Sequence, residues 1–314
     1  MKGDVHCVVR PFASGLECAS SPAGPIEPPT YKFLGGSCFT VNYLSGSNLV
    51  KTISYDGAGN QTNTSMGTAN AVNEYSNFTY NPRGDLTDDG TYAYTWNAAD
   101  QLVAVTAHGN SVKVTFQWDG EGRCIEKDVY TSNDGEDDGA AAWTLSYARK
   151  FVYDGTQLVE ELDGNGNPVT GYTWGPQGLL AVTDFTGGAK TVYMAELDGQ
   201  SNVVGLVNAE TGQVAATYTY SPYGALLTAT GPAQGVDDVL AKQGLTVREV
   251  KLNLFSVRFE NWDGVWIQRD PAGIAGGSNL FEYCGNDPVN WSDSTGKHRK
   301  QNTENRTQLD SYSR

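Results

Sequence analysis

The feature of this sequence that most constrains its fold is a short unit of alternating aromatic residues, an Asp or Asn, and a glycine. Aromatics at positions i and i+2 point to one face of a strand, where they pack against neighbouring strands. The Asp or Asn can bond the backbone two residues on, and glycine then supplies a positive φ at low cost. Copies of the unit occupy residues 55–60, 78–86, 92–102, 116–123, 151–155, 172–175 and 218–224.

Each copy predicts a β-hairpin that buries its apolar face only by packing against its neighbours. The composition agrees, because 37 of the 314 residues are glycine and the chain holds 17 Tyr, 7 Trp and 10 Phe. Such a mixture is typical of many short strands joined by tight turns. We therefore predict an all-β fold, a curved antiparallel sheet built from hairpins with a turn-rich cap near the C-terminal end.

The chain divides into four parts by composition. Residues 1–45 are rich in Pro, Ser and Gly and are predicted to form a poorly ordered lead-in, and residues 46–250 form the repeat sheet. Residues 251–297 form the cap, and the polar tail 298–314 is predicted to be disordered because it has almost no apolar residues to bury. No stretch approaches the ~20 apolar residues of a membrane span, and no apolar run of a secretory signal is visible at the N-terminus.

The net charge and the pattern of possible metal-binding residues argue against several kinds of binding site. A net charge of −15 argues against a nucleic-acid partner, since a phosphate-binding face needs positive charge. Five cysteines without a paired spacing and three scattered histidines make a zinc site improbable, and the thiols are predicted to act as small apolar residues. The acidic insert 132–139 is interpreted as a solvated hairpin tip, because its carboxylates do not follow the order of a calcium loop. No metal and no cofactor are expected.

Three motifs near the C-terminus carry a resemblance to a known family. They are Gln-Arg-Asp-Pro-Ala-Gly at 268–273, Gly-Gly-Ser-Asn-Leu at 276–280, and Gly-Asn-Asp-Pro-Val-Asn at 285–290. These motifs resemble the RDPxG, GGxNL and GNDPVN sequences of the core domain of the RHS (rearrangement hotspot) family. The aromatic–Asp–Gly units resemble the YD repeats of the same family, so the resemblance covers roughly residues 50–297. The family includes C components of insecticidal toxin complexes, bacterial polymorphic toxins and the teneurins.

The resemblance implies a spiralling shell of YD hairpins, with the core domain lining or plugging one end. In many members the core cuts the chain just after itself and leaves a C-terminal toxin inside the shell. Two aspartates in DPxG-like motifs are associated with that cut, and the matching positions are Asp270 and Asp293. The scissile bond would join Lys297 to His298. The resemblance also implies a secreted or cell-surface protein whose partners are the rest of the shell or a toxin segment.

The chemistry of an aspartate pair suits such a cut. Two carboxylates brought close together cannot both ionise easily, so one keeps a proton. The ionised carboxylate can activate a water while the protonated one polarises the peptide carbonyl. The alternative is that Asp270 and Asp293 only open turns through bonds to the backbone, and sequence spacing does not decide between these roles.

Three functions follow as hypotheses. The first is a structural and processing module with at most aspartyl self-cleavage and no activity on external substrates. The second is a module that binds cell-surface glycans through exposed aromatics. The third is an effector in which residues 298–314 are the remnant of a toxin. Exposed aromatics gathered on one face would favour the second hypothesis, whereas inward-facing aromatics would favour the first.

Overall fold

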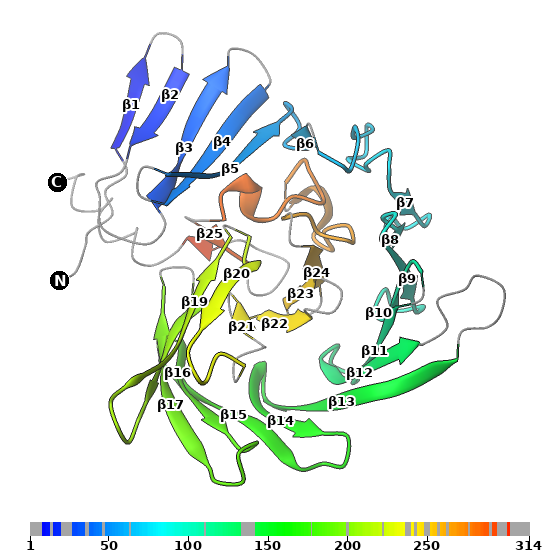
Figure 1. Ribbon diagram of the computed structural model, residues 1–314. Coiled ribbons are helices and arrows are strands. Elements are labelled where there is room, and N and C mark those ends of the chain that lie inside the picture. The colour runs from blue at the N-terminus through cyan, green and yellow to red at the C-terminus, as the bar shows by residue number, and fades with distance from the viewer. Residues whose placement is uncertain are drawn as a thin grey trace.

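In the computed structural model the described part of the chain is built from β-strands and two short 3₁₀ turns, with no α-helix (Figure 1). The side chains of residues 52–62, 64–109, 111–132, 142–176, 178–198, 201–221, 223–235, 264–274, 277–288, 291 and 293 are described, and elsewhere the backbone of the strands. The prediction of an all-β fold is confirmed. The acidic insert beyond Ser132, Trp262, Lys297 and His298 lie outside the described residues.

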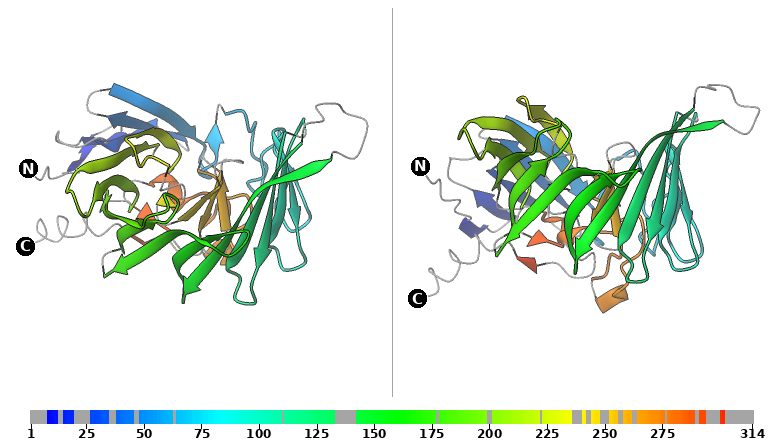
Figure 2. Two further views of the ribbon diagram at one scale, coloured as in Figure 1. Left: turned by 60° about the horizontal axis from the view of Figure 1, so that its bottom comes forward. Right: turned by 90° about the horizontal axis from the view of Figure 1, so that it is seen from below.

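The largest element is a sheet of fourteen antiparallel strands in which every strand pairs with its neighbours in sequence. These strands are β7 (Thr79–Tyr80), β8 (Leu86–Asp88), β9 (Tyr92–Trp96), β10 (Leu102–Ala107), β11 (Val112–Trp118), β12 (Cys124–Ser132), β13 (Trp143–Asp154), β14 (Gln157–Asp163), β15 (Pro168–Gly175), β16 (Gly178–Asp184), β17 (Thr191–Leu197), β18 (Val203–Asn208), β19 (Val214–Tyr220) and β20 (Leu226–Thr230). The sheet curves into a trough (Figure 2), as the sequence predicts.

Four smaller sheets accompany it. They are formed by β1 (Val8–Phe12) and β2 (Gly15–Ala19); by β3 (Glu27–Leu34), β4 (Cys38–Ser45), β5 (Asn48–Tyr55) and β6 (Gln61–Thr62); by β21 (Leu240–Ala241), β22 (Gly244–Val247), β23 (Leu252–Phe255) and β24 (Arg258–Asn261); and by β25 (Trp291–Ser292) and β26 (Lys300–Gln301). Strands β1 to β4 lie within the segment that the sequence predicts to be a poorly ordered lead-in. The division of the chain into domains stays a prediction.

One five-residue loop recurs eight times in the described part of the chain. Its first residue is Asp, Asn or Ser, whose side-chain oxygen accepts the N–H of the fifth residue. The fourth residue has a positive φ and donates its N–H to the first carbonyl. The geometry is that of a type I turn followed by a left-handed residue. The loops are residues 56–60, 70–74, 81–85, 97–101, 119–123, 163–167, 198–202 and 221–225.

The repeats mark one rim of the large sheet. In an antiparallel meander, successive hairpins turn at alternate rims. The loops after β7, β9, β11, β17 and β19 therefore share one rim with the tighter turns after β13 and β15, whereas loop 163–167 lies on the other. Copies 151–155 and 172–175 of the sequence unit form these tighter turns, because Asp154 pairs directly with Gln157 and Gly175 with Gly178.

The aromatic residue at the end of a hairpin strand ties that hairpin to the preceding one. Trp96 Nε1 donates to the Leu86 carbonyl at 2.7 Å, and Trp118 Nε1 donates to the Leu102 carbonyl at 2.8 Å. The same link recurs as Tyr153 to Cys124, Trp174 to Leu158 and Tyr220 to Val203. Every accepting residue is itself buried. Each link satisfies a buried carbonyl and is worth about 1 kcal/mol.

The main apolar core follows one face of the curved sheet from Leu86 to Ala233 and includes Ile267. Figure 1 shows β21–β24 and the segment that follows them inside the curve of the sheet. The sequence predicts one sheet for the hairpin region, but the structure has a break between β6 and β7. There the Asn70 side chain accepts the N–H groups of Val72 and Glu74, so these donors are satisfied within a loop.

Candidate functional site

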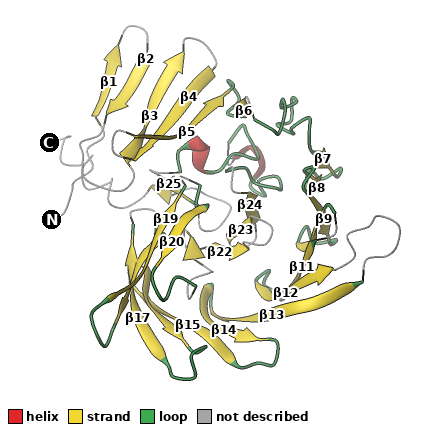
Figure 3. Cartoon of the chain, viewed as in Figure 1, coloured by secondary structure: helices red, strands yellow, loops and turns green. Residues whose placement is uncertain are grey.

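The C-terminal segment, residues 264–293, contains all three family-like motifs and is held mainly by turns (Figure 3). Trp266 N–H donates to the Phe281 carbonyl and Asp270 N–H to the Leu280 carbonyl, which folds the segment back on itself. Two 3₁₀ turns, η2 (Gly273–Ala275) and η3 (Cys284–Asn286), complete it. With so little regular structure, the segment depends on contacts with the rest of the molecule.

The first contact is a buried asparagine network on loop 56–60. Asn279 Nδ2 donates to Asn60 Oδ1 at 2.9 Å, and the same oxygen accepts Asn73 Nδ2 at 3.2 Å. Asn286 Nδ2 reaches the Gly59 carbonyl at 2.8 Å and Glu282 Oε2 at 3.1 Å. The GGxNL-like and GNDPVN-like motifs thus each supply an amide that binds the first loop. Buried amides stabilise a structure only when they are paired in this way.

The second contact is made by Arg269 of the RDPxG-like motif. Its Nη2 pairs with Glu74 Oε1 of loop 70–74 at 2.6 Å, and its side chain lies directly on Gly84 of loop 81–85. A Cβ at residue 84 would overlap the guanidinium, so this close approach requires glycine. Beside it, Leu86 N–H donates to the Ile267 carbonyl at 2.8 Å.

The third contact joins the last loop of the large sheet to the segment. Tyr223 of loop 221–225 is fully buried, with its ring against Gly264 and edge-on to Tyr283. Trp266 also packs edge-on to Tyr283, with ring centroids 5.4 Å apart. The Tyr223 hydroxyl lies 2.7 Å from the Tyr55 hydroxyl at the end of β5. The segment therefore joins the first hairpins to the last one across the curve.

The segment carries unusual backbone strain where it meets loop 56–60. Cys284, Gly285 and Asn286 have consecutive positive φ angles of 52°, 63° and 61°. Left-handed geometry costs roughly 1–2 kcal/mol for each residue with a Cβ. Buried Cys284 and the two Asn286 hydrogen bonds hold this turn in place. Strain of this kind persists only where the surrounding structure determines the conformation.

The sequence predicts one cluster of aromatics in this part of the chain, formed by Trp262, Trp266, Phe281, Tyr283 and Trp291, and this prediction is only partly correct. Trp266, Tyr283 and Trp291 pack together, but they do so with Ile53, Tyr55 and Tyr223. Phe281 belongs instead to a separate cluster, which also contains Met66, Tyr75 and Val265. The Phe281 ring packs edge-on to Tyr80 of β7, with ring centroids 5.6 Å apart.

Both predicted catalytic aspartates lie in this segment. Asp270 is half-buried, and its Oδ1 accepts the Ala272 N–H at 2.7 Å, as a turn-opening role requires. Asp293 is buried, with 5% of its surface exposed, and its N–H lies 3.5 Å from the Tyr283 hydroxyl. Asp270 therefore opens the turn at residues 270–273, and Asp293 lies beside Tyr283. Pairing of their carboxyl groups stays a prediction.

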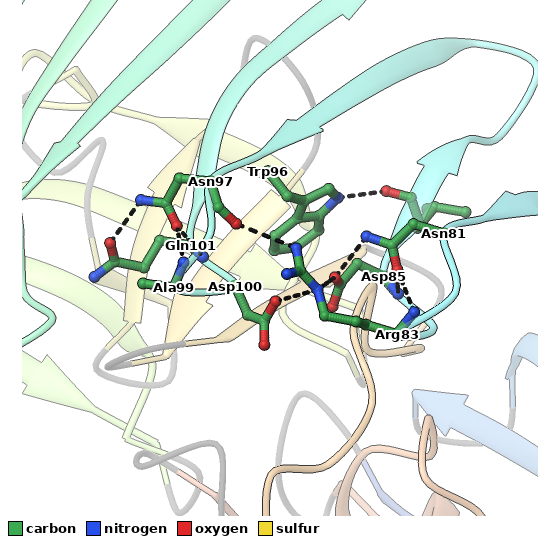
Figure 4. A network of polar contacts seen from close by, with 9 residues as sticks. Asn81, Arg83, Asp85, Trp96, Asn97, Ala99, Asp100 and Gln101 are labelled. Atoms are coloured by element: carbon green, nitrogen blue, oxygen red, sulfur yellow. Dashed lines mark hydrogen bonds and ion pairs between the residues drawn. The ribbon is translucent and has the colours of Figure 1, made fainter.

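Neighbouring loops on the repeat rim are also linked to each other. Arg83 of loop 81–85 donates from Nη2 to the Asn97 carbonyl at 3.2 Å and forms an ion pair with Asp100 of loop 97–101 (Figure 4). Arg123 repeats the device by donating to the Gly155 carbonyl at 2.7 Å. Because Arg83 and Asp100 are each about half exposed, the ion pair contributes little stability. It orders the rim.

No aromatic side chain in the described ranges is exposed. Most of them pack in the apolar clusters, and five form the links between hairpins. A hollow of about 450 Å³ does border loop 70–74, with half-buried Phe78 and Tyr80 in its wall. Among the described residues no helix is both long and apolar enough to cross a membrane.

Similar sequences occur in a bacterial nuclease and in a toxin subunit. The chain is 26% identical over 263 residues to the tRNA3(Ser)-specific nuclease WapA of Bacillus spizizenii, and the match covers 80% of this chain. It is 25% identical over 323 residues to the toxin subunit YenC1 of Yersinia entomophaga, covering 90% of this chain and 32% of that protein. The chain spans about a tenth of the length of the WapA nuclease.

The fold is shared with a solved toxin complex. The crystal structure of TcdB2-TccC3 superposes with a TM-score of 0.57 and 17% sequence identity, covering 85% of this chain and 13% of that chain. No protein-family model matches the sequence. The similar proteins thus include a nuclease and a toxin subunit, and the TcdB2-TccC3 structure contains a similar fold.

Proposed function

We propose that the chain is a structural and processing module, the C-terminal part of an RHS-type toxin or cell-surface shell protein. The observation that carries the proposal is the C-terminal segment, which binds loops 56–60, 70–74, 81–85 and 221–225 from inside the curve. Its partners would be the remaining shell and a downstream toxin segment, and its location would be outside the cell. Similarity to WapA and YenC1 supports the toxin context.

The processing step would be hydrolysis of the Lys297–His298 peptide bond by Asp270 and Asp293. The ionised carboxylate takes a proton from a water as the water oxygen bonds to the Lys297 carbonyl carbon. The protonated carboxyl donates a hydrogen bond to the carbonyl oxygen. Collapse of the tetrahedral intermediate breaks the C–N bond, and the released proton goes to the His298 amine. The products are a new carboxylate and a new amine.

Intact mass of the purified chain tests this proposal. We expect a species ending at Lys297 to accumulate in the wild-type protein and to be absent in Asp270→Asn and Asp293→Asn. Asn at either position retains an oxygen that can accept a turn hydrogen bond, so folding is preserved. A full-length mass that persists for days at pH 5 and pH 7 would support the turn-only role of both aspartates instead.

A further inference from the structure

We infer that docking of loop 221–225 on the end of β5 positions Asp293, so that processing depends on contact between the first and last hairpins. This inference rests on the proposed function, because it concerns regulation of the same cut. The residues that carry it are three buried tyrosines, Tyr55, Tyr223 and Tyr283, which form one continuous path to Asp293.

The path begins where the two ends of the repeat region meet. Tyr55 ends β5 and Tyr223 lies in the last repeat loop, and they are 168 residues apart in sequence. Their hydroxyl oxygens are 2.7 Å apart, and both side chains are fully buried. A hydrogen bond between residues so distant in sequence forms only when the first and last hairpins are docked against each other.

The path continues through the C-terminal segment. The Tyr223 ring lies edge-on to Tyr283, with centroids 6.5 Å apart, and Trp266 encloses the other side of Tyr283. Fully buried Tyr283 directs its hydroxyl at the Asp293 N–H. Tyr283 is thus a positioning residue for Asp293. If Tyr223 is displaced, Tyr283 loses one aromatic neighbour, and the 3.5 Å contact of its hydroxyl with the Asp293 N–H is weakened.

This arrangement makes cleavage depend on docking of the last hairpin. A chain whose last hairpin is not docked would lack the Tyr55–Tyr223 contact, and Asp293 would be held less firmly. Catalytic groups misplaced by about 1 Å can lose on the order of 100-fold in rate. The cut would therefore follow completion of the fold.

Tyr→Phe variants test the inference through two measurements, the rate of cleavage and amide hydrogen exchange. Tyr55→Phe and Tyr223→Phe remove the shared hydrogen bond but keep both rings. Tyr153→Phe is the matched control, because it removes a tyrosine hydroxyl that donates to the Cys124 carbonyl in the middle of the sheet. We expect cleavage to be at least about fivefold slower in Tyr55→Phe and in Tyr223→Phe, and unchanged in Tyr153→Phe. The double variant should be no slower than either single variant, since both lose one bond.

The second measurement does not depend on cleavage. In an Asp270→Asn background, amide hydrogen exchange of residues 283–293 should be faster in Tyr55→Phe and Tyr223→Phe than in Tyr153→Phe. If exchange responds in this way but the wild-type chain is never cut, the coupling stands and the proposed function fails. If the wild-type chain is cut, and both variants match it in cleavage rate and exchange, the coupling is overturned while the proposed function stands.

Discussion

The large sheet and the C-terminal segment are stabilised in opposite ways. In the sheet, every strand pairs with its neighbours in sequence, and each aromatic link spans one hairpin. In the segment, the decisive partners of Arg269, Asn279 and Asn286 lie 195 to 227 residues away. Loss of one hairpin contact should therefore destabilise the sheet only locally. Loss of the segment should destabilise the whole molecule, because the segment joins distant parts of the chain.

The largest expected effect is from Trp266→Ala. This ring is 2% exposed and packs against Tyr283 in the cluster that joins the first and last hairpins. Removing a buried aromatic of this size should cost about 3–5 kcal/mol of unfolding free energy. Denaturant unfolding of the whole chain provides the measurement. A loss under about 1 kcal/mol would mean that the segment does not stabilise the sheet.

Alanine substitutions at two glycines separate the cost of backbone strain from the cost of disturbing the contact with the segment. Gly84 and Gly90 have nearly equal positive φ angles of 87° and 83°, but only Gly84 lies against Arg269. Alanine at either position should cost about 1–2 kcal/mol through strain. Gly84→Ala should cost about 1–3 kcal/mol more, because the new Cβ displaces the half-buried Arg269 side chain. Equal unfolding free energies for the two variants would contradict this contact.

A buried thiol makes the sheet sensitive to alkaline pH. Burial raises the pKa of Cys124 in β12 from 9.0 to about 12. The unfolded thiol ionises near pH 9 while the folded thiol stays protonated, so this stability is present below pH 9 and is lost as pH rises toward 12. At pH 11 the loss should be on the order of 2 kcal/mol. Cys124→Ala should lack this part of the pH dependence between pH 8 and pH 11, and identical profiles would show that the thiol does not contribute.

The smallest effect concerns one link between hairpins. Tyr153→Phe removes the 2.8 Å hydrogen bond to the Cys124 carbonyl but keeps the ring beneath Arg123. We expect a loss of about 1 kcal/mol. Tyr130→Phe is the control, since the Tyr130 hydroxyl contacts Asp128 of its own strand, β12, rather than another hairpin. If the control loses as much unfolding free energy, the inter-hairpin links do not contribute more to stability than a contact within one strand.

The sequence predicts the sheet better than the segment for a physical reason. Hairpins are encoded locally, by aromatic alternation and a turn residue, and their existence and curvature were predictable. Loops 70–74, 163–167 and 198–202 were missed as copies of the unit. In two of them Asn73 and Ser201 adopt the positive φ where the pattern leads one to expect glycine. Loop 163–167 does contain Gly166 at that position, but no aromatic pair precedes it.

The candidate site was predictable only in part. The motifs located the segment, and the prediction that the thiols act as small apolar residues is confirmed for Cys124 and Cys284, which are buried in apolar clusters. The contacts of Tyr283 with Tyr223, and of Tyr223 with Tyr55, leave no local pattern, because they depend on how far the sheet curves. For the same reason, the sequence could not separate Phe281 from the cluster around Trp266.

Hydrogen exchange of the repeat loops tests most directly whether the segment joins the first and last hairpins. Loops 56–60, 81–85 and 163–167 share the same internal hydrogen bonds, but only the first two contact the segment. Amides of loops 56–60 and 81–85 should therefore exchange more slowly than those of loop 163–167 in the wild-type chain. In Trp266→Ala their protection should fall to the level of loop 163–167. Equal protection of all three loops in the wild-type chain, or protection unchanged by Trp266→Ala, would contradict the account.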